Sequence, residues 1–160
     1  IELHHRGEPS RDVMAALAHL RSQPNVRVDA ITAIGWSYGG GAIMAALEGL
    51  PAEQTAPFRA VLLYPDCRRR TPWKAPTDVL VLLAGNDDVA PPDRCRDTLG
   101  GSAAPARIQA RSYPQALHAF DVDELPARTT YPFGTIGYHK ESAAAAWAEI
   151  DRFLKAGAIK

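Results

Sequence analysis

Three short segments rich in apolar residues constrain the fold of this chain most strongly. They lie at residues 26–34, 58–65 and 78–85, and the last two read FRAVLLYP and DVLVLLAG. Such nearly continuous apolar runs are typical of strands buried on both faces of a parallel sheet. Segments of helical composition alternate with them, which predicts an α/β fold with helices on both faces of the sheet.

The remaining elements follow from periodicity and from the residues that end helices. Helices are expected at 10–23, 38–48, 91–100 and 141–157, and a fourth, alternating strand at 106–113. The positions expected to face the core are Val13, Leu17 and Leu20 in the first helix and Trp147, Ile150, Phe153 and Leu154 in the last. Residues 114–140 form a long irregular stretch, and loops of that length are often functional.

Length and charge exclude several classes of protein. The 160 residues fit one domain spanning 1–160. The 18 basic and 18 acidic side chains cancel, which argues against nucleic acid or an anionic membrane as a partner. No apolar run is long enough to span a bilayer, and the polar start IELHHRGEPS is unlike a signal peptide. The cellular location stays open, and the basic run at 68–70 is interpreted as a solvated loop.

A G-x-S-x-G pattern lies where the strand at 26–34 meets the helix at 38–48. It consists of Gly35-Trp36-Ser37-Tyr38-Gly39. The pattern is loose, but a strand before it and a helix after it are the context of a nucleophile elbow, which exposes a strained serine. The turn is expected to leave no room for side chains at Gly35 and Gly39. The backbone N–H of Tyr38 is the expected oxyanion-hole donor. The alternative is a glycine-rich turn with a capping serine.

An acid and a histidine follow the later strands. Asp87 and Asp88 lie just past 78–85, and His118 lies just past 106–113. Because the carboxyl ends of parallel strands meet at one edge, Ser37, an aspartate and His118 are predicted to form a Ser-Asp-His triad. His118 taken alone could simply pack in a loop. The other histidines, which lack such a placement, are His4, His5, His19 and His139.

These segments resemble the dienelactone hydrolase family of α/β-hydrolases along most of the chain. The residues that carry the resemblance are GWSYGG (35–40), LYPDC (63–67), LLAGNDDVAPPDRC (82–95) and SYPQALHAFD (112–121). Family members show a Y-P-G-A-x-H-x-F-D-like segment around the catalytic histidine, and here Gln115 replaces the glycine. Alignment of the family's D-D-W-T-P…C segment favours Asp87 as the acid, whereas alignment on Gly85 gives Asp88.

The resemblance implies a carboxylic-ester hydrolase acting on a small ester or lactone, with no metal or organic cofactor. Family members of the dienelactone type use cysteine as nucleophile, so Ser37 implies ordinary serine-esterase chemistry instead. The alternatives are a catalytically silent remnant that acts as a binding or assembly module, and the same triad used for acyl transfer or peptide cleavage. Tyr131, Phe133 and Tyr138 are expected to wall the pocket, or else to pack the long loop.

The family fold has about eight strands, with the elbow after the fifth. The chain therefore resembles the C-terminal half, with about four strands, and is expected to be incomplete at its N-terminus. It has no candidate segment for the second oxyanion donor. The bare edge of the elbow strand predicts a missing segment or a second chain, as in a homo-oligomer, to cover it.

Cys67 and Cys95 are too few for a disulfide scaffold and lack zinc-site spacing. The resemblance to the family implies that the two cysteines follow neighbouring strands. Whether they form a disulfide is left open.

Overall fold

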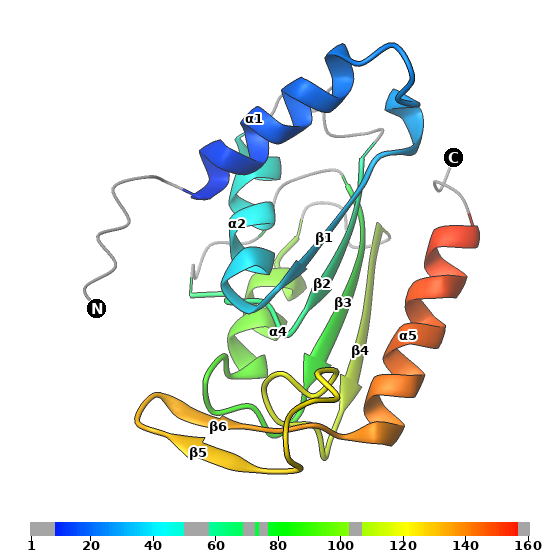
Figure 1. Ribbon diagram of the computed structural model, residues 1–160. Coiled ribbons are helices and arrows are strands. Elements are labelled where there is room, and N and C mark those ends of the chain that lie inside the picture. Colours follow the sequence, from blue (N-terminus) through cyan, green and yellow to red (C-terminus); the bar gives the residue numbers. More distant parts are fainter. Residues whose placement is uncertain (1–8, 50–57, 69–72, 74–76, 103–106, 157–160) are drawn as a thin grey trace.

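A parallel sheet of four strands is the centre of the fold. The computed structural model describes residues 9–49, 58–68, 73, 77–102 and 107–156. The strands are β1 (Thr32–Trp36), β2 (Arg59–Leu63), β3 (Asp78–Ala84) and β4 (Ile108–Tyr113), in that order across the sheet. Every neighbouring pair is parallel, so the carboxyl ends of all the strands lie at one edge (Figure 1). The predicted α/β class with about four parallel strands is confirmed.

Helices cover both faces of the sheet (Figure 1). They are α1 (Pro9–Ser22), α2 (Ser37–Glu48), α4 (Pro92–Gly100) and α5 (Lys140–Lys155). Side chains of β3 alternate between two cores: Val81 packs in one with Leu47 of α2, and Leu82 packs in the other with Ile150 of α5. Every residue of β2 and β3 is buried. Burial on both faces is why each of these strands is apolar at every position after its first, charged residue.

Two predicted segments differ from the observed elements. The strand expected at 26–34 begins with a turn of 3₁₀-helix at Val28–Ala30, and β1 itself continues to Trp36. The long stretch 114–140 contains an antiparallel hairpin of β5 (Thr129–Tyr131) and β6 (Gly134–Ile136). Strands of three residues are too short to produce a recognisable alternation, which is why the sequence did not reveal them.

The apolar stripe of α5 is narrower than predicted. Ile150 and Phe153 are buried as expected, but Trp147 and Leu154 are 46% and 41% exposed. The other buried residues of the stripe include Ala143 and Ala146. These small side chains let α5 lie close to the sheet, so the larger residues beside them stay at the surface. In α1, Leu17 is buried but Leu20 is 38% exposed, so the prediction that Leu20 faces the core was also wrong.

A disulfide joins Cys67, which follows β2, to Cys95 in α4. Both residues are buried. The backbone N–H of the preceding residue, Asp66, donates to the carbonyl oxygen of Ser37 at 2.9 Å. The disulfide therefore ties α4 to a loop that contacts the turn between β1 and α2.

Candidate active site

Ser37 occupies a sharp turn between β1 and α2. Its φ of 49° lies in the left-handed region, which a side chain other than glycine adopts at a cost of about 1–3 kcal/mol. A Cβ built on Gly35 would lie 2.9 Å from the backbone carbon and oxygen of Gly39, so the position two residues before the serine has no room for a side chain. A Cβ on Gly39 would meet nothing within 4 Å. The expectation that both glycines are sterically required was therefore wrong for Gly39.

His118 lies between Ser37 and Asp87. Its Nε2 atom is 2.8 Å from the hydroxyl oxygen of Ser37, and its Nδ1 atom is 2.7 Å from Oδ2 of Asp87. A carboxylate can only accept, so this arrangement favours the imidazole that carries its proton on Nδ1 and leaves Nε2 to accept from the serine. His118 and Asp87 are 8% and 6% exposed, so the hydrogen bond between them is shielded from water, whereas the bond to Ser37 is only partly buried.

The two neighbouring aspartates point to different partners. Oδ1 of Asp87 accepts from the backbone N–H groups of Val89 and Ala90 at 2.9 and 2.8 Å, which fixes the carboxylate against His118. Asp88 is exposed and accepts from the backbone N–H of Thr135, in β6, at 2.7 Å. That hydrogen bond holds the pKa of Asp88 below its usual range. Asp88 therefore anchors the hairpin and does not contact the histidine.

Tyr38 is the second residue of α2. Backbone N–H groups in the first turn of a helix point out of its amino end, where the helix dipole favours negative charge. The Tyr38 side chain is 51% exposed beside Ser37. The position suits the expected oxyanion donor, and that role stays a prediction.

Tyr64 is a part of the site that the sequence did not indicate. It follows β2, has a φ of 36°, and packs its ring edge-on against the ring of His118 at 4.7 Å between centroids. Burial raises the pKa of Tyr64 strongly, with a further contribution from the hydrogen bond that its hydroxyl donates to Asp121. No motif singled out Tyr64, although the tyrosine lies in the LYPDC segment.

The two other histidines that the structure describes do not take part in this hydrogen-bonded series. His139 caps α5, since its Nδ1 atom accepts from the backbone N–H of Ser142. His19 lies exposed on α1. His4 and His5 fall outside the described residues.

The aromatic residues of the long stretch are divided between the surface and the core. Tyr131 and Phe133 stack on each other at 5.2 Å near the hairpin tip and are 42% and 62% exposed. Tyr138 packs against the core on the α5 side. Their role as pocket walls stays a prediction.

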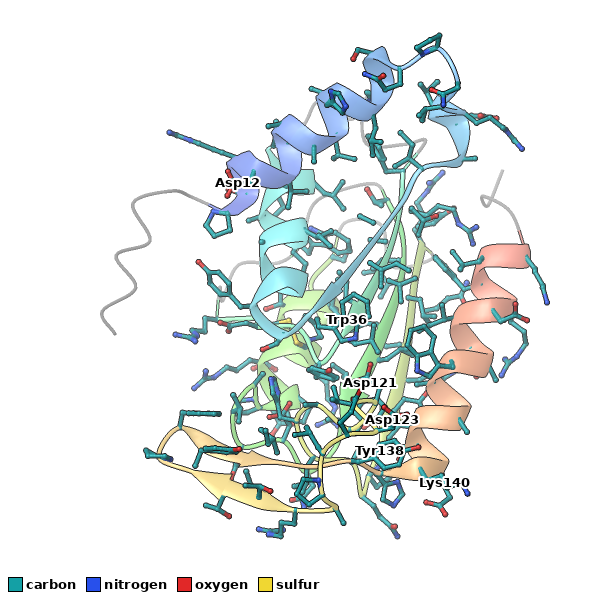
Figure 2. The ribbon with its side chains drawn as sticks, in the orientation of Figure 1. Asp12, Trp36, Asp121, Asp123, Tyr138 and Lys140 are labelled. Carbon is teal, nitrogen blue, oxygen red and sulfur yellow. A yellow bond between two sulfur atoms is a disulfide. The ribbon has the colours of Figure 1, made fainter. Side chains whose placement is uncertain are left out.

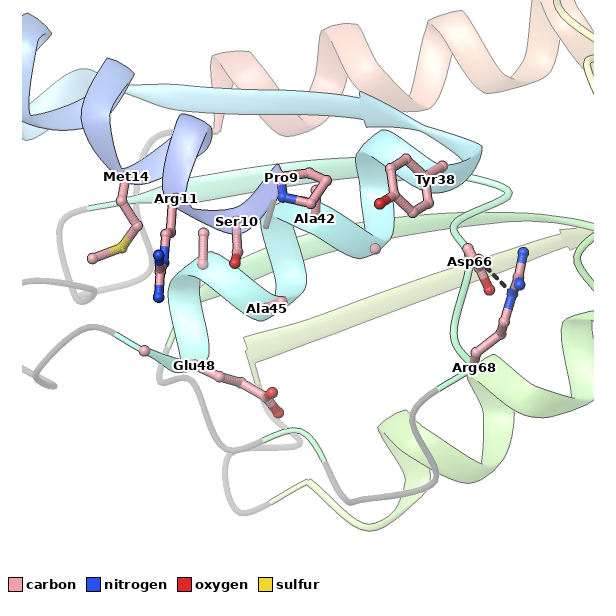
Figure 3. A pocket seen from close by; sticks show the side chains of 13 residues that line it. Pro9, Ser10, Arg11, Met14, Tyr38, Ala42, Ala45, Glu48, Asp66 and Arg68 are labelled. Carbon is pink, nitrogen blue, oxygen red and sulfur yellow. Dashed lines mark ion pairs between the residues drawn. The ribbon is translucent and has the colours of Figure 1, made fainter. Parts of the chain in front are cut away.

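A cavity of about 600 Å³ lies over α1 and α2 (Figure 3). Its lining includes Tyr38 and Ala42, and the ion pair of Asp66 with Arg68 at 2.7 Å, but neither Ser37 nor His118. We do not assign the substrate to it, because chemistry at Ser37 requires the bound carbonyl to reach the serine oxygen. Of the basic run 68–70, Arg69 and Arg70 lie outside the described residues.

Within the described ranges, no group of three His, Cys, Asp or Glu side chains is arranged to hold a metal ion. None of the helices that the structure describes has the length and apolarity of a membrane-spanning segment.

The model of the dienelactone hydrolase family matches residues 2–157. The chain belongs to this family. Among solved structures, this dienelactone hydrolase family member is similar to a Klebsiella pneumoniae protein assigned as a dienelactone hydrolase (21% identity, TM-score 0.69, covering 92% of this chain and 62% of that one). It is also similar to a dienelactone hydrolase-like promiscuous phosphotriesterase from metagenomic libraries (20% identity, TM-score 0.68, covering 92% of this chain and 60% of that one).

A more distant similarity is to a carboxylesterase from Lactobacillus plantarum, with 16% identity, a TM-score of 0.54, and coverage of 92% of this chain and 64% of that one. This family member therefore spans between 60% and 64% of the length of these three structures. A comparison with curated proteins found no significant match.

Proposed function

We propose that the chain carries the catalytic residues of a serine hydrolase that cleaves a small carboxylic ester or lactone through an acyl-enzyme. The observation that supports this proposal is the continuous hydrogen-bonded series from Ser37 through His118 to Asp87, at 2.8 and 2.7 Å, with the serine on a strained turn at a helix start. Hydrolases of several unrelated folds use this arrangement to activate a serine.

In the acylation half of the reaction, Oγ of Ser37 forms a bond to the ester carbonyl carbon while Nε2 of His118 takes the serine proton. Asp87 stabilises the resulting imidazolium. The carbonyl oxygen becomes an oxyanion that accepts from the backbone N–H of Tyr38. The carbon–oxygen bond to the leaving group then breaks, and His118 passes its proton to the departing alkoxide. With a lactone, this alkoxide stays attached to the acyl group.

In the deacylation half, a water molecule attacks the acyl carbon and His118 takes the water's proton. The bond to Oγ then breaks, and His118 returns the proton to Ser37, which restores the starting state.

The experiment combines a chromogenic short-chain ester with a fluorophosphonate, whose fluoride is displaced by an activated serine. We expect turnover of the ester. We also expect the intact mass to increase by one phosphonyl group, attached to Ser37. Asp87→Asn should lower kcat by on the order of 10⁴-fold, because the amide favours the wrong imidazole tautomer. Asp88→Asn is the matched control and should keep most of the activity, since Asp88 contacts Thr135 and not His118. Folded protein with neither turnover nor label would refute the proposal.

The second candidate is a catalytically silent binding or assembly module. It is favoured by the coverage of only 62% and 60% of the first two similar structures. In the described sheet β1 is an edge strand, and Trp36 at its end is 40% exposed. We propose that further strands or a second chain cover this edge. A monomer in light scattering, whose β1 amides exchange rapidly with solvent, would contradict the covered edge.

The similarity to a phosphotriesterase suggests that phosphotriesters should be tested as substrates alongside esters. In a phosphotriester, phosphorus is the electrophile that Ser37 would attack. Rapid labelling without turnover would identify such a compound as an inhibitor of this chain.

A further inference from the structure

Side chains from two strand ends converge on Asp121. Nε1 of Trp36 donates to Oδ2 of Asp121 at 2.8 Å, and the hydroxyl of Tyr64 donates to Oδ1 at 2.6 Å. Figure 2 shows Trp36 and Asp121 facing each other beneath the end of β1. Trp36 directly precedes Ser37, and Asp121 lies in the same loop as His118. One carboxylate therefore connects the serine turn with the histidine loop.

The backbone around this carboxylate is strained at two positions. Tyr64 has a φ of 36° and Ala119, next to His118, has a φ of 61°. Such conformations persist only where surrounding contacts impose them. The ring of Tyr64 packs edge-on against His118 at 4.7 Å and against Phe120 at 5.5 Å. The hydroxyl bond to Asp121 fixes this ring, and the ring in turn limits the positions open to the imidazole.

Other hydrogen bonds hold the histidine loop from a different direction. The backbone N–H of Gly137 donates to the carbonyl of His118, and that of His139 donates to Phe120, both at 3.0 Å. These bonds attach the loop to the segment after β6. The Asp121 bonds instead attach the loop to the ends of β1 and β2.

We propose that Asp121 is a positioning residue, which clamps the His118 loop to the ends of β1 and β2 and so sets the distance between Nε2 of His118 and the oxygen of Ser37. This inference rests on the proposed function, because Asp121 acts on the reaction only through His118. It requires Trp36 and Tyr64 as donors and assigns neither a contact with substrate.

The test compares Asp121→Asn with Asp123→Asn, an exposed carboxylate in the same loop (Figure 2). An asparagine can accept from one of the two donors, but its NH₂ group then faces the other. Trp36→Phe and Tyr64→Phe each remove one donor and keep an aromatic ring. Two quantities are measured: the limiting rate of Ser37 phosphonylation with its half-saturating reagent concentration, and the low-field NMR resonance of the His118 Nδ1 proton.

We expect Asp121→Asn to lower the limiting rate by about 10- to 100-fold, since displacement of a catalytic group by about 1 Å costs up to ~10²-fold. The half-saturating concentration should stay within about 2-fold, because the clamp does not bind the reagent. The Nδ1 resonance should broaden or disappear. Each phenylalanine variant should show part of the effect, and Asp123→Asn none of it.

Wild-type rate and resonance in Asp121→Asn would overturn the inference, as would equal effects of Asp121→Asn and Asp123→Asn. If the wild type is not labelled at all, the proposed function fails, and the NMR comparison still decides whether Asp121 positions His118. If Asp121→Asn does not fold, the Trp36→Phe/Tyr64→Phe double variant gives the same decision, since it removes both donors and leaves the carboxylate.

Discussion

The space around the two glycines that flank the candidate nucleophile leads to opposite predictions for two similar substitutions. In Gly35→Ala the new Cβ would lie 2.6 Å from Cδ1 of Ile43 and 2.9 Å from the backbone carbon and oxygen of Gly39. The tip of Ile43 can rotate away, but the backbone of Gly39 belongs to the first turn of α2 and can move only with the helix. In Gly39→Ala the new Cβ would meet nothing within 4 Å.

The magnitudes follow from packing and propensity. Overpacking a buried site costs about 1–3 kcal/mol, of which alanine's lower unfolded-state entropy offsets about 0.5–1 kcal/mol. We therefore expect Gly35→Ala to lower the free energy of unfolding by about 1–2 kcal/mol. In Gly39→Ala the steric term is absent, so the exchange within a helix should raise that free energy by about 0.5–1 kcal/mol.

Urea unfolding followed by tryptophan fluorescence measures the difference between the two variants, which we expect to be about 2–3 kcal/mol. Thermal unfolding should separate their midpoints by about 5–10 °C for a domain of this size. Gly35→Ala should also slow phosphonate labelling, because α2 cannot shift without moving Ser37. If Gly35→Ala is as stable as Gly39→Ala, the close contact between Gly35 and the turn of α2 is not present in solution, and the steric account of the elbow is refuted.

Two further predictions concern stability. Replacing both Cys67 and Cys95 by alanine should lower the free energy of unfolding by about 3–4 kcal/mol, the loop-entropy value for the sequence separation of 28; a loss in urea unfolding below about 1 kcal/mol would contradict this. Burial raises the pKa of Tyr64 and of Tyr113, so the folded state retains protons that the unfolded state loses near pH 10. This contribution to stability is complete below pH 10 and is lost as the pH rises beyond it. Ultraviolet titration of the folded protein should find both phenols less ionised at pH 10 than exposed tyrosines are. Normal titration of both phenols would be inconsistent with the burial of these rings.

Much of the fold follows from local patterns. The positions of β2 and β3 could be predicted because a strand buried on both faces is mostly apolar, and only the first residue of each strand, Arg59 or Asp78, is charged. The strands β5 and β6 could not be predicted, because three residues are too few to show an alternation. The exposure of Trp147 could not be predicted either, because it depends on how closely α5 packs on the sheet.

The candidate site likewise has parts that could be predicted from the sequence and parts that could not. Chain order and strand ends were enough to bring Ser37 and His118 together as candidates, since parallel strands place their carboxyl ends at one edge. They could not separate Asp87 from Asp88, because adjacent side chains leave the backbone in different directions and only the folded loop determines which one reaches the imidazole. Sequence separation likewise hid the contacts of Asp121 with Trp36 and Tyr64, which lie 85 and 57 residues away.

By itself, the sequence determined the α/β class, the order of strands and helices along the chain and the glycine-flanked turn at Ser37, because these depend on periodicity and on residues next to one another. Only the tertiary structure decided the partner of His118, the pairing of Cys67 with Cys95, the room beside Gly39 and the convergence on Asp121. Each of these depends on how segments distant in sequence lie relative to one another, and that geometry exists only when the sheet and its loops have assembled.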